Sequence, residues 1–518
     1  MAAAGPDLVA LGLTVTNLAA MLWSVAMGRR VAGIGGEAGQ SNVPWPVSIH
    51  VERLFALMDE MLDERYGQDL LPRRGDGDRF RLVEAFGSQD EGVSWPIGRT
   101  ETVDDRCWVQ SARVAAEARR AVGAPEPRML LSTLDDVHAA LDEPAALQVS
   151  PGKVAEMMMA YLEDLERIDR VRGAHTPRVR LFTDHRAILT GVGDDARPVG
   201  VPIGVPIGVP IGVTVERRHP IAAAGEEMPG LADAAPVDLG TPEILLIDGR
   251  ASDIQAQDLG FTTCPVTIEK PGGRRLVTWQ SDCVECVVQM DTQTDVRRRV
   301  ASEFDEDGDE YWVHQIALRE PGSPGRVRLL LQVPEFMSFD PIAAGAVAEG
   351  TPLESAEYLD AVALLLDGFG RGRLLDIAAC DASAAGAEYR ILSTRLFPIV
   401  ARAGAQARMS SNAFVAGETL GGGHFHDGRH VTTGLVLHSL RVLHHWQQRD
   451  DGVNRWESLD ALGSGLVDDV KALLDVTMRD YPEAPQAHFI DDCFQQIAEA
   501  RSHRRTVAAL LSARDSAG

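Results

Sequence analysis

Hydrophobic positions in the first third of the chain recur at the spacing of an α-helix. The segment 48–66 places five apolar side chains on one face and is followed by Gly67, a residue typical just past the end of a helix. The face consists of Val51, Leu54, Phe55, Met58 and Leu62. The pattern predicts a helix that packs this face against a core.

A second helix is predicted after Ser150, a capping residue, with Pro151 in its first turn and Gly173 beyond its end. Its apolar stripe is rich in methionine, an adaptable residue that usually fills core space. The stripe consists of Val154, Met157, Met158, Tyr161, Leu165 and Ile168.

From about 177 to 335 the pattern changes to short runs of β-branched and apolar residues between Gly, Pro and Asp clusters. This spacing is typical of a β-sandwich or barrel. The acidic stretch 305–310 holds an Asp-Gly pair, a hairpin signal, and lacks the glutamate that a calcium loop needs at its twelfth position. The tandem GVPI repeat at 200–213 predicts a loop or an edge ribbon, because proline cannot donate to a central strand.

Helical patterns return after 351, where Thr351 and Glu354 form a capping box around Pro352. The order is therefore helical, then β, then helical. We expect an α+β fold with N- and C-terminal helical regions packed together, and an inserted β-rich, sandwich-like domain. The predicted segments are 1–176 (N-terminal helical region), 177–335 (β-rich domain) and 336–518 (C-terminal helical region).

The segment Leu8–Gly28 carries no charge for 21 residues and is followed by Arg29 and Arg30. That length suffices for a membrane span. Its Thr, Asn and Ser residues favour instead a helix that is buried or contacts a partner, and Asp7 stands where a signal peptide would be basic. A membrane anchor stays the alternative.

The net charge of −26 excludes general affinity for nucleic-acid phosphates, so no sequence-specific nucleic-acid binding is expected. Six scattered cysteines are typical of an intracellular, reducing compartment. The CxxC pair Cys283 and Cys286 could bind zinc together with Cys264 and His314, but two cysteines in a strand are the favoured interpretation.

Common catalytic signatures are absent from the sequence. It contains no phosphate-binding P-loop, no nucleophile elbow and no HExxH zinc pair. The glycine-rich stretch 368–372 follows a helical pattern instead of a strand, which disfavours a dinucleotide site there. Cys380 lacks the flanking residues of a known nucleophile motif and is expected in the core.

Three histidines, His424, His426 and His430, lie within seven residues behind three glycines. On a strand, His424 and His426 would point to the same side, and His430 could complete a three-nitrogen face for zinc or iron. The HxHxxxH spacing resembles the first motif of cupins, with His430 where they carry Glu, and no second cupin motif follows. The alternative is a glycine-rich loop that leads into the helix at 432–448.

Two functions follow from these patterns. The first is a self-assembling shell or capsid subunit that binds copies of itself and needs no cofactor. Its layout is similar to that of trimeric shell proteins of double-stranded RNA viruses, a resemblance that implies a virion location. The alternative is a metal-dependent enzyme, with His424, His426 and His430 as ligands and Asp427 as their hydrogen-bonding partner or a general base.

Overall fold

The computed structural model describes about three fifths of the chain, in separate ranges. These are residues 5–35, 45–46, 49–66, 73–74, 78–79, 101–102, 147–149, 151–171, 178–183, 185–192, 198–200, 209–217, 235–249, 253–265, 267–269, 276–278, 280–290, 298–304, 310–319, 325–333, 337–380, 389–400, 402–422 and 429–478.

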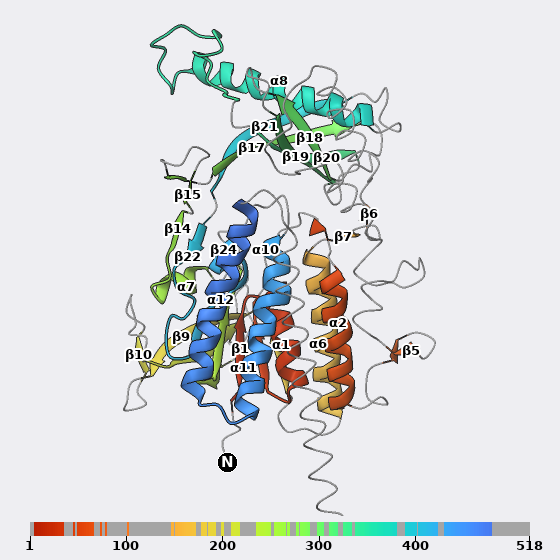
Figure 1. Cartoon of the computed structure of the whole chain (residues 1–518), viewed down its shortest axis with the longest axis vertical. Helices are drawn as coiled ribbons and strands as arrows, with labels where there is room; N and C mark the ends of the chain where they lie inside the picture. The colour runs from red at the N-terminus through yellow and green to blue at the C-terminus, as the bar shows by residue number, and fades with distance from the viewer. Residues whose placement is uncertain are drawn as a thin grey trace, which may run out of the picture.

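A parallel five-stranded sheet forms the centre of the lower body in Figure 1. Its strand order is β23-β13-β1-β2-β8, and every neighbouring pair is parallel. The strands are β1 (Leu8–Leu11), β2 (Val31–Ile34), β8 (Val179–Phe182), β13 (Ile244–Ile247) and β23 (Ala413–Val415). Every residue of β1 and β13 is buried, as expected for a sheet that is covered on both faces.

The apolar segment Leu8–Gly28 is not a single helix. It forms β1, a turn at Gly12 and α1 (Val15–Ala26), and α1 is buried on all sides. The uncharged run is explained by this burial, since a central strand and a central helix both lack a solvent face. Among the described residues, no helix is long and apolar enough to span a membrane.

Three α-helices pack on α1, a fourth packs on one of them, and all four lie in front of the parallel sheet in Figure 1. They are α2 (Ile49–Tyr66), α6 (Pro151–Val171), α11 (Ser439–Asp450) and α12 (Arg455–Met478). The predicted stripes of the first two helices are confirmed: the five apolar residues of α2 are fully buried, and so are all those of α6 except Ile168, which is partly buried.

A four-stranded antiparallel sheet in the order β10-β9-β11-β12 lies beside this body. Its strands are β9 (His185–Val192), β10 (Pro198–Gly200), β11 (Ile211–Arg217) and β12 (Val237–Gly240). The end of the GVPI repeat, Ile211–Val213, belongs to β11, an interior strand, so the prediction of a loop or edge ribbon was wrong there. Past Pro210 the chain is free of proline as far as Arg217 and can donate to both neighbours.

A five-stranded antiparallel sheet lies at the top of Figure 1, in the order β18-β19-β20-β17-β21. The strands are β17 (Gln280–Met290), β18 (Arg298–Phe304), β19 (Glu310–Arg319), β20 (Arg326–Gln332) and β21 (Tyr389–Val400). Phe304 pairs with Glu310, which confirms the hairpin around the acidic stretch. The helix α8 (Ala356–Cys380) packs on β17 and β21.

The helix α8 begins later than the capping box predicts. Ser355 caps it by accepting a hydrogen bond from the Tyr358 amide at 3.2 Å, and residues 351–355 form turns ahead of it. The glycines at 368–372 lie inside this helix and are therefore not a nucleotide-binding turn.

The remaining elements are short. The strands are β3 (Trp45–Pro46), β4 (Arg73–Arg74), β5 (Asp78–Arg79), β6 (Glu101–Thr102), β7 (Leu147–Val149), β14 (Thr263–Pro265), β15 (Thr267–Glu269), β16 (Leu276–Thr278), β22 (Arg402–Gly404) and β24 (Gly421–Gly422). The helices are α7 (Asp253–Asp258), α9 (Gly417–Leu420), α10 (Arg429–Thr432) and the π-helix η2 (Thr433–His438).

The expectation of a mixed helix-and-sheet protein is confirmed, whereas the sandwich-like domain is not seen among the described residues. The parallel sheet takes strands from all three predicted segments: β1 and β2 from 1–176, β8 and β13 from 177–335, and β23 from 336–518. In the described part, the sheet of β17–β21 is covered by a helix. The segment boundaries themselves stay predictions.

Candidate functional site at the carboxyl edge of the parallel sheet

The carboxyl ends of β1, β13 and β23 meet at one edge of the sheet, because the three strands are parallel neighbours. From β1 the chain passes through α1 to β2 on one side, while β13 and β23 lie on the other. A parallel sheet reverses its winding at such a strand, and ligands of doubly wound proteins bind outside the carboxyl ends there. The residues that follow these three strands therefore form the candidate site.

Asp248 follows β13 and joins the three strand ends. Its side chain is buried, and its Oδ2 accepts a hydrogen bond from the Thr14 hydroxyl, just after β1, at 2.6 Å. Its Oδ1 accepts one from the amide of Thr419, just after β23, at 3.2 Å. One carboxyl group thus connects segments that are more than 160 residues apart in the sequence.

Burial raises the pKa of Asp248 to about 7, and the charge of Glu418 adds to the rise. Hydrogen bonds from Thr14, Thr419 and Thr16 oppose it, because they stabilise the carboxylate. This carboxyl group therefore changes its charge near neutral pH.

Gly417 forms the turn after β23 and has a left-handed φ of +55°. A Cβ at this position would lie 2.1 Å from Asp248 Oδ2, so only glycine fits. Its amide donates to His438 Nδ1 at 2.9 Å. Burial lowers the pKa of His438 to about 3, helped by the charge of Arg441, so the ring is neutral and serves as an acceptor.

Glu418 and His430 are the polar pair of the site that reaches solvent. The Nε2 of His430 lies 3.0 Å from Oε1 of Glu418, and the Glu418 side chain is 43% exposed while that of His430 is 8% exposed. A histidine and a carboxylate at hydrogen-bond distance can exchange a proton and pass it to a bound molecule.

The predicted histidine cluster is only partly described. His424, His426 and Asp427 lie outside the described residues, and His430 lies in α10 beside Glu418. Among the residues that the structure describes, no group of three or more His, Cys, Asp or Glu side chains is arranged to hold a metal ion. The metal site formed by His424, His426 and His430 stays a prediction, as does the zinc or iron it would hold.

The predicted strand around the CxxC pair is confirmed as β17, where Cys283 and Cys286 are buried free thiols. Burial raises the pKa of each to about 12, which disfavours the thiolate that zinc requires. Cys264 lies exposed on β14, in a different sheet. These described cysteines do not form the four-ligand zinc site that was considered as an alternative.

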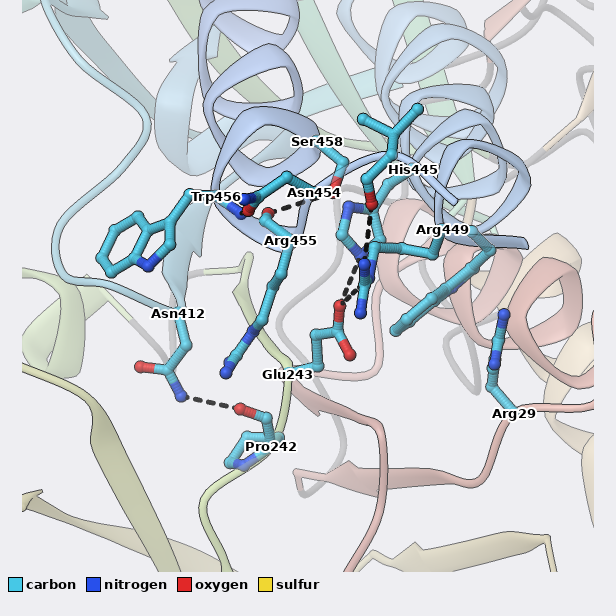
Figure 2. A network of polar contacts seen from close by, with 12 residues as sticks. Arg29, Pro242, Glu243, Asn412, His445, Arg449, Asn454, Arg455, Trp456 and Ser458 are labelled. Carbon is cyan, nitrogen blue, oxygen red and sulfur yellow. Dashed lines mark hydrogen bonds and ion pairs between the residues drawn. The ribbon is translucent and has the colours of Figure 1, made fainter. Parts of the chain in front are cut away.

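A second polar network lies at the opposite, amino edge of the sheet (Figure 2). Glu243, just before β13, accepts from Arg449 at 2.9 Å and lies 3.3 Å from His445 Nε2. Burial alone would raise the pKa of Glu243, but His445 and Arg449 outweigh it and lower the pKa. Asn412 donates to the Pro242 carbonyl at 3.0 Å. These bonds attach α11 and β23 to the start of β13, which is a structural role.

No known protein family matches the sequence, and no curated protein matches it. Solved structures do match. The p-nitrophenol 4-monooxygenase from Pseudomonas putida is 13% identical, with a TM-score of 0.44 and 98% of each chain covered. The anhydrotetracycline hydroxylase of Streptomyces rimosus is 14% identical, with a TM-score of 0.40, over 98% of this chain and 76% of that one. At these scores the function has to be argued from the geometry.

The expectation of a shell or capsid subunit was wrong. It depended on a sandwich inserted between helical halves, and the described residues of all three predicted segments contribute strands to one parallel sheet instead. A flavin-dependent monooxygenase solved with FAD and substrate also matches, at 13% identity and a TM-score of 0.42, over 99% of this chain and 72% of that one. The virion location, which rested on the shell hypothesis, has no support either.

The functional residues that the sequence interpretation missed are Thr14, Asp248 and Glu418. Each follows a short apolar run, in "LVALGLT", "ILLID" and "AFVAGE". Recognising these runs as buried parallel strands would have identified all three, since polar residues just after such strands collect at the carboxyl edge.

Proposed function

We propose that this chain is a small-molecule enzyme of the doubly wound α/β class. Its ligand binds over the carboxyl ends of β1, β13 and β23, beside Glu418 and His430. The observation that carries the proposal is the convergence of three parallel strand ends on one polar cluster, with the strand order reversing at β1.

The chemical role of the pair is proton transfer. Glu418 is the exposed member, and the buried His430 holds the Glu418 carboxylate through the 3.0 Å contact. A ligand hydroxyl or amine that reaches Glu418 can lose a proton to the pair or receive one from it. Asp248 and His438 lie deeper and position the turn that carries Glu418.

Ligand-induced thermal stabilisation tests the proposal. A panel of phenols, aromatic acids, FAD and NADPH is added to the purified full chain. FAD is included because one of the compared structures was solved in complex with it. A ligand present at about 100 times its Kd stabilises the folded state by about 2.7 kcal/mol. We expect at least one small molecule to raise the melting temperature.

The variants Glu418→Gln and His430→Asn are expected to raise the Kd of the stabilising ligand at least about tenfold, because each removes one charge-assisted hydrogen-bond partner. The matched controls are Glu457→Gln and His444→Asn, which change exposed residues of α12 and α11. A panel without any stabilising ligand, or equal ligand affinity in all four variants, would contradict the proposed site.

A further inference from the structure

The turn between β1 and α1 occupies the position where doubly wound proteins bind the pyrophosphate of a dinucleotide. Three glycines usually build that turn, in the order G-x-G-x-x-G. The first makes the tight turn, the second lets the backbone approach the pyrophosphate, and the third allows close packing of helix and strand. In this chain the three positions hold Gly12, Thr14 and Asn17.

The first position keeps its function, since Gly12 has a left-handed φ of +88°. At the second position Thr14 caps α1, accepting from the Asn17 amide at 3.3 Å and donating to Asp248. Its methyl group packs against Gly249, where a Cβ would lie only 2.8 Å from Thr14 Cγ2. The hydrogen-bonded side chain of Thr14 therefore lies where a dinucleotide-binding turn has only backbone, so that the pyrophosphate can approach.

At the third position, too, a hydrogen-bonded side chain replaces the glycine. Asn17 is fully buried, and its Nδ2 donates to the carbonyls of Leu11 and Gly12, at 2.8 Å each. These bonds hold the turn closed from within. A glycine would leave both carbonyls without this donor, so Asn17 suits a turn that is stabilised by the protein itself.

The amino end of α1 also has its own acidic group. Asp248 accepts from Thr14, the cap residue just before α1, and from Thr16 in the first turn of α1. The amino terminus of a helix attracts negative charge, and this carboxyl group fills that place from within the protein. A phosphate group brought to the same turn would meet Asp248 and, next to it, Glu418.

We infer that Thr14 and Asp248 occupy the pyrophosphate position themselves, and that the ligand of the carboxyl edge is a small molecule without a phosphate at α1. The inference rests on the proposed function for the location of the ligand. The fold would imply a dinucleotide such as FAD or NAD(P)H, but the residues present do not fit one held at this turn.

The test is a titration of FAD and of NADPH into the wild-type chain and into the double variant Thr14→Gly/Asp248→Asn, followed by fluorescence and calorimetry. We expect no saturable binding to the wild type, and at least about tenfold tighter binding to the double variant. Thr351→Gly/Asp258→Asn is the matched control, because it makes the same substitutions outside α1 and the turns at the carboxyl edge. Circular dichroism and the melting temperature show whether each variant folds.

Stoichiometric binding of FAD or NADPH by the wild type, weakened by Thr14→Gly alone, would overturn the inference. If the double variant folds but does not bind FAD or NADPH more tightly, Thr14 and Asp248 are not the residues that exclude a dinucleotide from this turn. Both results concern only dinucleotides. The proposed function is contradicted separately, by a full panel in which no small molecule stabilises the wild type.

Discussion

At the scale of single residues, Asp248 is the buried carboxyl group that joins three strand ends of the candidate site. Its two oxygens accept from Thr14 and from the Thr419 amide, and Gly417 leaves room for it by lacking a side chain. A buried carboxylate is costly unless it is hydrogen-bonded, which explains why so many short-range partners converge on it.

The stability of the protein is expected to fall with rising pH because of Asp248. Its folded pKa of about 7 lies above the ordinary value near 3.9, so the folded state binds more protons between these two values. The stabilisation is complete below about pH 4 and is lost as the pH rises through 7, by up to roughly 4 kcal/mol at 1.36 kcal/mol per pKa unit.

Urea unfolding of the wild type and of Asp248→Asn measures this dependence. The pH is varied from 4.5 to 8, roughly the window set by the two pKa values. The buried His438, whose pKa is lowered, contributes a slope of the opposite sign below its ordinary pKa of about 6.5, and it does so in both proteins. The difference between the two curves isolates Asp248. Parallel curves would show that Asp248 does not titrate in this window.

Gly417→Ala is expected to destabilise the protein by about 2–4 kcal/mol. The left-handed φ costs about 1 kcal/mol, and overpacking against Asp248 adds about 1–3 kcal/mol. Gly452→Ala is the control, because Gly452 also has a left-handed φ (+87°) but nothing within 4 Å of the added Cβ. Equal losses in denaturant unfolding would show that the contact with Asp248 does not matter.

At the scale of elements, the central pair is α1 and α11, which come from opposite ends of the chain. Trp23 Nε1 donates to Ser439 Oγ at 3.1 Å, and Trp446 Nε1 donates to Ser24 Oγ at 2.7 Å. Both indoles are buried, so each needs an acceptor inside the core. The two bonds fix how α11 lies against α1, and thereby where the preceding η2 and α10 carry His438 and His430.

Ser24→Ala and Ser439→Ala are each expected to cost about 1–3 kcal/mol, because each leaves a buried indole N–H without its acceptor. Ser464→Ala on the exposed side of α12 is expected to change the free energy of unfolding by less than about 0.5 kcal/mol. If both core variants behaved like Ser464→Ala, the reciprocal bonds would not hold the helix pair together.

The element scale also shows what the sequence could predict. Periodicity identified α2 and α6 with their buried faces, because one polar face makes the helical period visible. For Leu8–Gly28 a buried helix was predicted and is present as α1, but β1 was missed, since both elements are buried on all sides and show no period. The pairing of β1 with β13 joins residues more than 230 positions apart, and a local pattern holds no information about such a partner.

At the scale of the whole molecule, the two edges of the parallel sheet differ in chemistry. The amino edge is closed by bonds between its own groups, such as those of Glu243 and Asn412 in Figure 2. The carboxyl edge carries the exposed Glu418 beside His430, as well as a carboxyl group whose charge changes near pH 7. The sequence interpretation assigned His430 to a metal site with His424 and His426, and that site stays a prediction. The contact of His430 with Glu418 could not be predicted, because Glu418 comes close to His430 only after β23 has joined the sheet.

Hydrogen exchange with and without the stabilising small molecule tests the location of the site most directly. We expect slower amide exchange in the peptides that hold the carboxyl-edge turns, 11–15, 247–249 and 416–420, and unchanged exchange around Glu243 and Asn412 at the amino edge. Protection confined to the amino edge or to the sheet of β17–β21, with none in the three turns, would contradict this location of the site.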